Sequence, residues 1–231
     1  MELKKISKAF DILSKAYDLI SYTMSLGVTI YWRKRLIDES VKLIKSETKY
    51  ILDLCTGTGD IAIGIYKKSQ NQNIKIIGFD ASFGMLKKFI EKSPNKENLI
   101  PILGDISQMP FKNKSFDIST MSFGARSLFE GEKDFSTYLK EIHRISKRLL
   151  NLETSHPKNP IIKALYKSYL YFIIVILGSI FFPHYNREYY RTIMTFPNYE
   201  RFSEILKQIG YDKVEAIPLF WGMAAIHIAY E

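Results

Sequence analysis

The sequence is poor in residues that cross-link a chain or bind structural metals. It holds one cysteine, Cys55, so no disulfide can form within the chain, and this content fits a reducing cytoplasmic compartment. The spacing of the four histidines, His143, His156, His184 and His227, is not that of a metal site. We therefore expect no bound metal, and we expect Cys55 to be a small packing residue rather than a nucleophile.

Long apolar stretches are also scarce. The uncharged stretch 169–182 is too short for a membrane-spanning helix, which needs about 20 apolar residues, so it is either a buried cap helix or an apolar wall for a lipid-like substrate that also touches the bilayer. Residues 1–8 lack an apolar segment, so we expect no secretory signal. Lysine and arginine outnumber the acids by 33 to 24, which favours nucleic acid or an anionic membrane surface as partner, although a solvated lysine-rich surface is the simpler explanation.

The 231 residues are enough for one domain with a sizeable core, because 46% of them are hydrophobic. Their periodicity predicts strands that alternate with helices, which is typical of a parallel sheet with helices on both faces. The predicted strands are a first one that begins at Tyr50 and ends near Asp53, and then 74–79, 99–103, 115–121, 148–152, 214–219 and 224–230. The predicted helices are 6–20, 29–45, 61–68, 83–91, 134–147 and 199–209. Within a single domain 1–231, we expect residues 1–48 to form a helical lid and residues 158–197 an apolar helical cap.

A glycine-rich turn follows the first predicted strand. The strand ends near Asp53, and Gly57-Thr58-Gly59 then leads into a helix at Asp60. Glycine adopts positive φ angles without steric cost and lets a ligand approach the backbone closely, so this turn is a candidate cofactor loop.

The turn alone does not identify the cofactor. Gly57-x-Gly59-x-x-Ala62, with Asp80 further along the chain, also satisfies the dinucleotide-binding pattern. Asp53 favours S-adenosylmethionine (SAM) over NAD, because a carboxylate suits an ammonium and a sulfonium group and is poorly placed beside a pyrophosphate.

Polar residues stand at the carboxyl end of each of the first five predicted strands. They are Asp53, Asp80, Asp105, Ser122 and Glu153. In parallel sheets ligands bind at this edge, so their coincidence is stronger evidence than any single motif. We expect Asp80 to accept from both ribose hydroxyls, and Asp105 to accept from the adenine amino group with the Ile106 amide near a ring nitrogen.

Two stretches are far more specific than the glycine loop: Tyr17-Asp18 followed by Met24-Ser25-Leu26-Gly27, and Ser122-Phe123-Gly124-Ala125-Arg126. They are accompanied by Phe10-Asp11, Trp32-Arg33, Pro110-Phe111, Leu152-Glu153 with Ser155 and Pro157, and the stretch from Gly222 to His227. With these motifs the chain, from about residue 10 to its end, resembles the ubiquinone/menaquinone-biosynthesis C-methyltransferases, which methylate a ring carbon of a prenylated quinol with SAM.

The resemblance implies a class I SAM-dependent methyltransferase fold, a Rossmann-like, seven-stranded and mostly parallel sheet whose last strand is antiparallel. By motif it places the cofactor contacts on Thr58, Asp80, Asp105, Ile106 and Ser122, to which the glycine loop itself adds Asp53, Gly57 and Gly59. We assign Arg126 to the stabilisation of phenolate character on the quinol. Tyr17, Asp18, His156 and His227 are candidates for positioning the substrate or removing its proton. The implied partner is a prenylated quinol met at the inner face of the membrane, without nucleic acid; a homodimer is left open.

The sequence departs from the family's pattern in two places. The Lys-Pro-Gly-Gly turn before the fifth strand is missing, because Lys147 runs straight into Arg148, and Ser127 stands where the family has asparagine after the arginine. The first change lies at the amino end of the strand and is expected to alter only a connection; the second makes the substrate less certain. The rival hypotheses are an NAD-dependent enzyme, an RNA or protein methyltransferase, another small-molecule methyltransferase, and a silent quinone- or lipid-binding protein.

Overall fold

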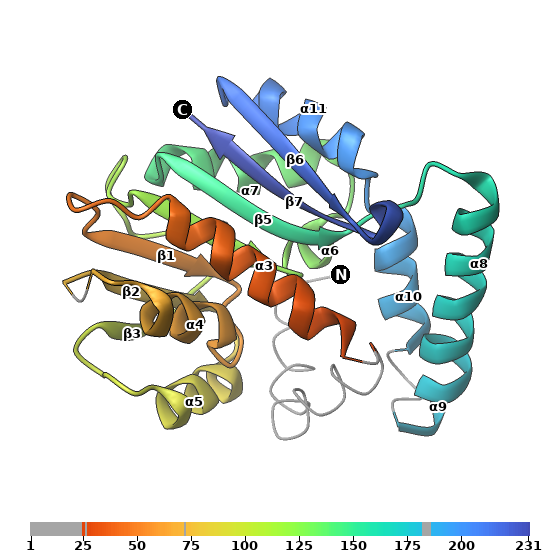
Figure 1. Ribbon diagram of the computed structural model, residues 1–231, viewed down its shortest axis with the longest axis horizontal. Helices are drawn as coiled ribbons and strands as arrows, with labels where there is room; N and C mark the ends of the chain where they lie inside the picture. Colours follow the sequence, from red (N-terminus) through yellow and green to blue (C-terminus); the bar gives the residue numbers. More distant parts are fainter. Residues whose placement is uncertain (1–24, 26, 72, 182–185) are drawn as a thin grey trace.

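A mixed β-sheet forms the centre of the computed structural model, which describes residues 25, 27–71, 73–181 and 186–231 (Figure 1). Among these residues the sheet has seven strands in the order β3-β2-β1-β4-β5-β7-β6. The strands are β1 (Tyr50–Leu54), β2 (Lys75–Asp80), β3 (Leu99–Leu103), β4 (Ile118–Ser122), β5 (Arg148–Thr154), β6 (Lys213–Leu219) and β7 (Ala224–Tyr230). The first five are parallel, and β7 runs antiparallel to both β5 and β6, as the resemblance implied.

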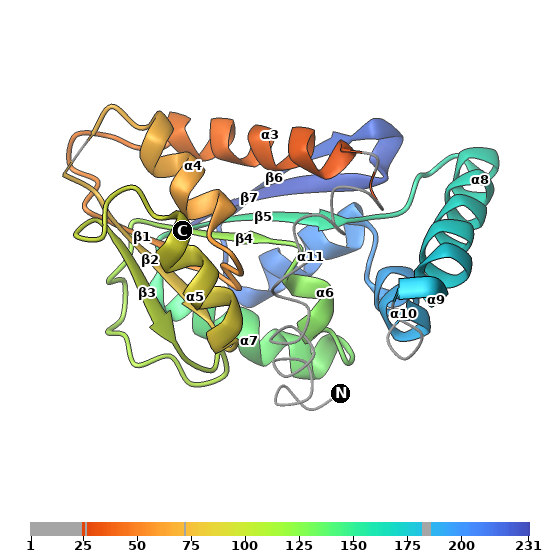
Figure 2. The same cartoon turned by 90° about the horizontal axis from the view of Figure 1, so that it is seen from below.

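Helices cover both faces of the sheet (Figure 2). One face carries α3 (Val28–Lys42), α4 (Asp60–Lys68) and α5 (Phe83–Lys92), and the other carries α6 (Ala125–Leu128), α7 (Glu132–Ile145) and α11 (Tyr199–Ile209). Between β5 and α11 the chain forms α8 (Pro160–Leu170), the π-helix η1 (Tyr171–Leu177), α9 (Gly178–Phe181) and α10 (Asn186–Thr195). Figures 1 and 2 both show these elements beyond the carboxyl ends of β1 and β5.

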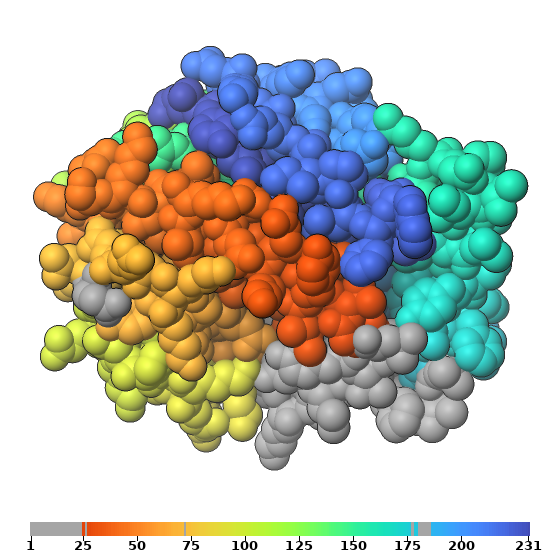
Figure 3. Space-filling model, viewed as in Figure 1, coloured from red at the N-terminus to blue at the C-terminus, as the bar shows by residue number. Residues whose placement is uncertain are grey.

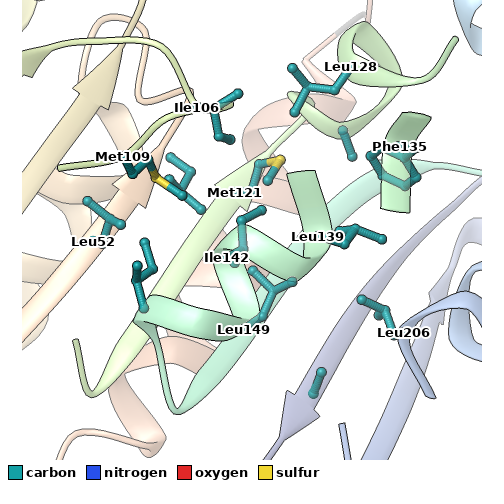
Figure 4. Close-up of a cluster of buried hydrophobic side chains, with 14 of the residues drawn as sticks. Leu52, Ile106, Met109, Met121, Leu128, Phe135, Leu139, Ile142, Leu149 and Leu206 are labelled. Atoms are coloured by element: carbon teal, nitrogen blue, oxygen red, sulfur yellow. The ribbon is translucent and has the colours of Figure 1, made fainter. Parts of the chain in front are cut away.

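Each face of the sheet has its own hydrophobic core because the parallel strands are apolar on both sides. One core packs Met121 and Leu149 against Phe135, Leu139 and other residues of α7 and α11 (Figure 4). The other core is formed by residues of α3, α4 and α5 against the opposite faces of β1, β2 and β5. Burial of this apolar surface holds the strands in register, so their carboxyl ends meet at one edge.

Most predicted strand and helix ends lie within two residues of those in the structure, and a few regions differ more. The fourth strand begins at Ile118 rather than at residue 115, since Phe116 makes only an isolated bridge to Ser146. The short helix α6 and the helix α10 are additional elements, and the described part of the predicted stretch 169–182, which ends at residue 181, is divided among α8, η1 and α9. The missing Lys-Pro-Gly-Gly turn is replaced by a tight connection in which Lys147 donates its amide to the Phe116 carbonyl at 3.1 Å.

The expected lid lies largely outside the described residues, together with the predicted helix 6–20. Its described helix, α3, packs on the sheet with Trp32 and Leu36 buried in the core, and its Arg33 pairs with Asp60 at the carboxyl edge of the strands. Helix α3 ends at Lys42, earlier than predicted. Within the described residues, none of the helices has the length and apolar character to traverse a bilayer.

Candidate active site

The glycine loop after β1 is held in a conformation that its sequence was expected to allow. Gly57 and Gly59 have φ angles of +55° and +83°, and Cys55 also has a positive φ angle, of 50°. A Cβ atom at Gly59 would lie 2.1 Å from the Phe89 ring, whereas one at Gly57 would meet nothing within 4 Å. Glycine is therefore needed at residue 59 for packing, and Gly57 leaves open space in front of the loop.

Asp53 lies beneath this loop rather than on its open side. Its side chain is 1% exposed, and its two carboxylate oxygens accept from Thr56 Oγ1 at 2.6 Å and Thr120 Oγ1 at 2.7 Å. Burial raises the pKa of Asp53 to about 6, and the two threonine hydroxyls act against this rise. These contacts show that Asp53 supports the loop; its predicted contact with a cofactor stays a prediction.

Asp80 connects the loop to the end of β2. Its Oδ2 accepts from the Gly57 amide at 2.8 Å, and its Oδ1 accepts from the Ser82 amide at 2.8 Å. Each carboxylate oxygen has a second acceptor position, so a fixed Asp80 can also accept from two vicinal hydroxyls. Asp105 is exposed at the adjacent strand end, where its Oδ1 accepts from the Ser107 amide at 2.8 Å, and Ile106 is buried beside it.

Ser122 ends β4, next to β1 in the sheet. Within the described residues its Oγ is buried and has no hydrogen-bond partner. The loop after β4 approaches the glycine loop closely, because a Cβ atom at Gly124 would lie 2.7 Å from Cys55 Cβ. The open space at Gly57, the fixed carboxylate of Asp80 and the unpaired Ser122 hydroxyl are together what an adenosyl amino acid requires: space above a glycine turn, a diol acceptor and a further polar contact.

An ion-pair network that sequence patterns did not reveal fixes the N-terminus of α4. Asp60, at the first residue of α4, accepts from Arg33 Nη1 at 2.9 Å and from Lys92 Nζ at 2.9 Å. Lys92 Nζ also donates to Thr58 Oγ1 at 2.8 Å. The network joins α3, α4 and α5 at the glycine loop, and it explains why Thr58, a predicted cofactor contact, is buried with its side chain already hydrogen-bonded.

Arg126 forms a buried ion pair at the end of β5. It lies in α6, is 4% exposed, and donates from Nη1 to Glu153 Oε1 at 2.6 Å; Glu153 is 1% exposed. Arg126 Nη2 donates to Tyr189 Oη at 2.9 Å, and the guanidinium carbon lies 5.0 Å from the Tyr189 ring centroid. The guanidinium also lies 5.4 Å from the ring of Phe123, whose φ angle of 57° is unusual for a residue other than glycine.

Tyr189 is the candidate residue that sequence reasoning missed. It is 42% exposed and belongs to α10, which was not predicted as a separate helix. It lies far from Arg126 in sequence, and no motif marks it. Glu153 had been noted at a strand end, but its pairing with Arg126 was not foreseen. The pair could have been suggested only by asking which cation neutralises Glu153, because a buried carboxylate needs a partner of opposite charge.

The remaining candidates are not brought into this cluster. His156 is half-buried, its Nε2 donates to the Phe196 carbonyl at 3.2 Å, and burial lowers its pKa. His227 is a sheet-face residue in the core, where its Nε2 donates to the Tyr199 carbonyl at 2.9 Å and burial lowers its pKa to about 4. Tyr17 and Asp18 lie outside the described residues. Burial and the nearby carboxylates of Asp80 and Asp53 raise the pKa of the Cys55 thiol, so it stays protonated.

The chain resembles solved methyltransferase structures in fold. It superposes on a putative O-methyltransferase from Nostoc punctiforme PCC 73102 with a TM-score of 0.64 and 12% identity, covering 96% of this chain and 60% of that chain. It also superposes on human N-acetylserotonin methyltransferase in complex with SAM, with a TM-score of 0.60 and 13% identity, covering 95% of this chain and 57% of that chain. These likenesses establish the class I methyltransferase fold that the sequence predicted.

Sequence comparisons are more specific. The demethylmenaquinone methyltransferase of Staphylococcus aureus (strain JH9) is 31% identical over 235 residues, which cover 99% of this chain and 93% of that protein. The family model described as the ubiE/COQ5 methyltransferase family matches residues 1–231. The chain therefore belongs to the ubiE/COQ5 methyltransferase family and is a SAM-dependent methyltransferase of quinone biosynthesis.

Proposed function

We propose that this chain methylates a ring carbon of a prenylated quinol, with demethylmenaquinol as the first substrate to test. The observation that carries the proposal is the meeting of two groups of residues at one sheet edge. The Gly57–Asp80 hydrogen bond holds the loop at the ends of β1 and β2, and the Arg126–Glu153 ion pair lies at the ends of β4 and β5. The S. aureus relative carries the name demethylmenaquinone methyltransferase, which supports the choice of quinol.

On one side of this edge, the chain's own residues provide the cofactor site. Asp80 accepts from the ribose hydroxyls, Asp105 and the Ile106 amide hold the adenine ring, and Ser122 and the glycine loop bind the remainder. When bound, SAM supplies an electrophilic methyl group on a positively charged sulfur. Asp53 keeps the loop in shape through its bonds to Thr56 and Thr120, so the backbone does not have to reorganise on binding.

On the other side, Arg126 and Tyr189 act on the quinol together. Arg126 is buried, so it acts on the substrate through Tyr189, whose phenol oxygen accepts from the guanidinium and keeps its own O–H for donation. A donor that is polarised by a fixed cation stabilises negative charge as the quinol hydroxyl loses its proton, which makes the ortho carbon a better nucleophile. Glu153 holds the guanidinium in place from behind.

The elements α8, η1 and α10 supply an apolar environment next to this cluster. Tyr166 of α8 is buried, and its Oη donates to the Met223 carbonyl at 3.3 Å. Ile174 and Val175 of η1 are buried as well, and Asn186 of α10 donates to the Val175 carbonyl at 3.0 Å. A prenyl tail needs such a surface, and water exclusion near the ring carbon strengthens the electrostatic effect of Arg126.

The decisive experiment is calorimetric titration of the wild type and Asp80→Ala with SAM and S-adenosylhomocysteine, followed by a methyl-transfer assay on short-chain quinols. Loss of Asp80 removes a charged acceptor, which predicts a decrease in affinity of roughly 10- to 100-fold. Asp117→Asn is the matched control, since Asp117 accepts from the Lys49 amide at the opposite, amino edge of the sheet. Failure of the wild type to bind SAM would overturn the proposal.

The role of Arg126 has a separate test. Arg126→Met should bind SAM with unchanged affinity and lose most of its turnover with demethylmenaquinol. Full turnover with SAM binding intact would show that the Arg126–Glu153 pair is structural only. Turnover with a benzoquinol and none with demethylmenaquinol would correct the substrate and keep the reaction.

A further inference from the structure

The turn between β6 and β7 carries two aromatic residues in an unusual backbone conformation. It is the short helix η2 (Phe220–Gly222), in which Phe220 has a φ angle of +43° and Trp221 one of +54°. Residues other than glycine seldom adopt positive φ angles, and such strain is concentrated at functional sites. Trp221 is 74% exposed, so its ring gains little from packing against the fold. Glycine or asparagine would suit this turn better if it served stability alone, so the aromatic side chains need another explanation.

The turn lies at the same edge of the sheet as the buried ion pair of Arg126 and Glu153. Leu219 pairs with Ala224 across the turn, and Ala224 pairs with Thr154 at the carboxyl end of β5. Glu153 immediately precedes Thr154 in that strand. Figure 3 shows the turn on the same visible surface as the beginning of α3 and next to α8. The exposed aromatic turn is therefore a neighbour of the reaction site.

A series of aromatic contacts connects the turn to Arg126. The Phe220 ring centroid lies 5.9 Å from that of Trp32, which lies 6.2 Å from that of Phe123. The guanidinium carbon of Arg126 is 5.4 Å from the Phe123 ring centroid. Tyr31, which is 51% exposed, packs on the other side of Phe220 with a centroid distance of 5.7 Å. Aromatic packing is thus continuous from the exposed turn to the catalytic arginine.

The turn also contacts the helices on the other side of the site. Tyr166 Oη of α8 donates to the carbonyl of Met223, the residue that follows the turn, at 3.3 Å. Tyr166 lies close enough to Arg126 and Tyr189 to interact with both electrostatically. The elements α8, η1 and α10 supply an apolar environment on one side of these residues, and the turn adds the side that faces α3.

A prenylated quinol fits this surface better than a second protein does. In such a quinol the tail is attached to the ring that is methylated, so the surface for its first isoprene units must begin directly beside the reaction site. Between Glu215 and Glu231 the sequence contains no aspartate, glutamate, lysine or arginine, so a tail meets no ionic group that it would have to desolvate. A stable contact between two copies of the chain needs about 20–30 residues on each side, far more than this turn and Tyr31 provide.

We propose that Phe220 and Trp221 bind the first isoprene units of the prenylated quinol, and that they give the enzyme its preference for a substrate with a tail. Phe220 forms the inner part of this subsite through its contact with Trp32, and the more exposed Trp221 forms the outer part. The inference rests on the proposed function, because it states how the same site accepts the tail. The strained backbone at the turn is then retained for binding rather than for stability.

The test uses the two tryptophans of the chain, Trp32 and Trp221, because quinones quench tryptophan emission. The probes are a menaquinone with two isoprene units and 2-methyl-1,4-naphthoquinone, which has the same ring and no tail. We expect the wild type to bind the tailed probe at least about 10-fold more tightly. Trp221→Gly should lose about 10-fold in affinity for the tailed probe and much less for the ring alone, with Trp32 as the remaining reporter. Trp221→Phe keeps an aromatic ring and should retain most of the preference.

Tyr50→Thr is the matched control, since Tyr50 is a 45% exposed aromatic residue at the amino end of β1. It should bind both probes as the wild type does. The urea midpoint of Trp221→Gly should be unchanged or higher, because glycine adopts the positive φ angle without strain and little packing is lost.

The tail subsite would be overturned by a wild type without preference for the tailed probe, or by a Trp221→Gly variant that binds this probe as tightly as Tyr50→Thr does. A clearly lower urea midpoint of Trp221→Gly would also overturn it, because the residue would then be structural. These titrations need neither SAM nor turnover, so a negative result leaves the proposed methyl transfer standing. Failure to bind SAM would instead remove the proposed function.

Discussion

The buried ion pair between Arg126 and Glu153 can be tested by the free energy of unfolding that is lost when one of its members is replaced. Both side chains are almost completely buried, with exposed fractions of 5% and 1%, and their charged atoms are 2.6 Å apart. Glu153 also accepts from the Thr154 amide at 2.7 Å and from the Arg126 amide at 3.1 Å. Replacement of Glu153 by glutamine keeps the shape and removes the charge that compensates Arg126.

The expected cost follows from this burial. Removal of one member of a buried pair leaves an uncompensated charge in a medium of low polarity, which costs about 3–5 kcal/mol of the free energy of unfolding. For a domain of this size, that corresponds to a decrease in Tm of roughly 6–20 °C. The double variant Arg126→Met/Glu153→Gln should lose less than the sum of the two single variants, because neither charge is then left alone.

The assay is urea unfolding of the wild type, the two single variants and the double variant, followed by far-ultraviolet circular dichroism. Arg201→Met provides the matched control, since Arg201 pairs with Glu132 at the same 2.6 Å but with side chains that are 40% and 45% exposed. An exposed pair contributes about 1 kcal/mol or less. The reasoning is refuted if Glu153→Gln loses no more stability than Arg201→Met, or if the single losses add fully in the double variant.

Three further outcomes are expected. Burial raises the pKa of Asp53 to about 6, so its carboxyl stabilises the fold when protonated, and this contribution is lost as the pH rises through 6. The free energy of unfolding of Asp53→Asn should therefore increase relative to that of the wild type by about 3 kcal/mol between about pH 4 and pH 7. A difference in urea unfolding that does not change with pH would contradict this. Gly59→Ala combines positive φ with a clash against Phe89 and should cost roughly 2–6 kcal/mol, well above Gly57→Ala, where only the φ strain applies. Tyr189→Phe keeps the ring over Arg126 and removes the hydroxyl, so kcat for the quinol should fall at least 10-fold while SAM affinity stays unchanged; equal losses in both would point to a merely structural role.

Local patterns in the sequence determined most of the architecture. The apolar runs that became β3 and β7 were predicted with the boundaries the structure shows, because short buried strands leave a distinct pattern in the sequence. The glycine loop was also predictable, since the positive φ angles found at Gly57 and Gly59 are those that glycine adopts without steric cost. The candidate cofactor edge followed from topology, because parallel strands place their carboxyl ends together.

What the sequence left undecided depends on contacts between residues far apart in the chain. A local motif can mark Arg126 as a candidate site residue. It does not show that Glu153 neutralises the guanidinium, or that the Tyr189 hydroxyl of α10 accepts a hydrogen bond from it. Sequence patterns also did not foresee that Asp53 is buried between Thr56 and Thr120, which follows because β4 lies next to β1 in the sheet. The exposed face of α8 and η1 was hidden in a uniformly apolar stretch, since only packing against the rest of the fold decides which side of such a helix meets water.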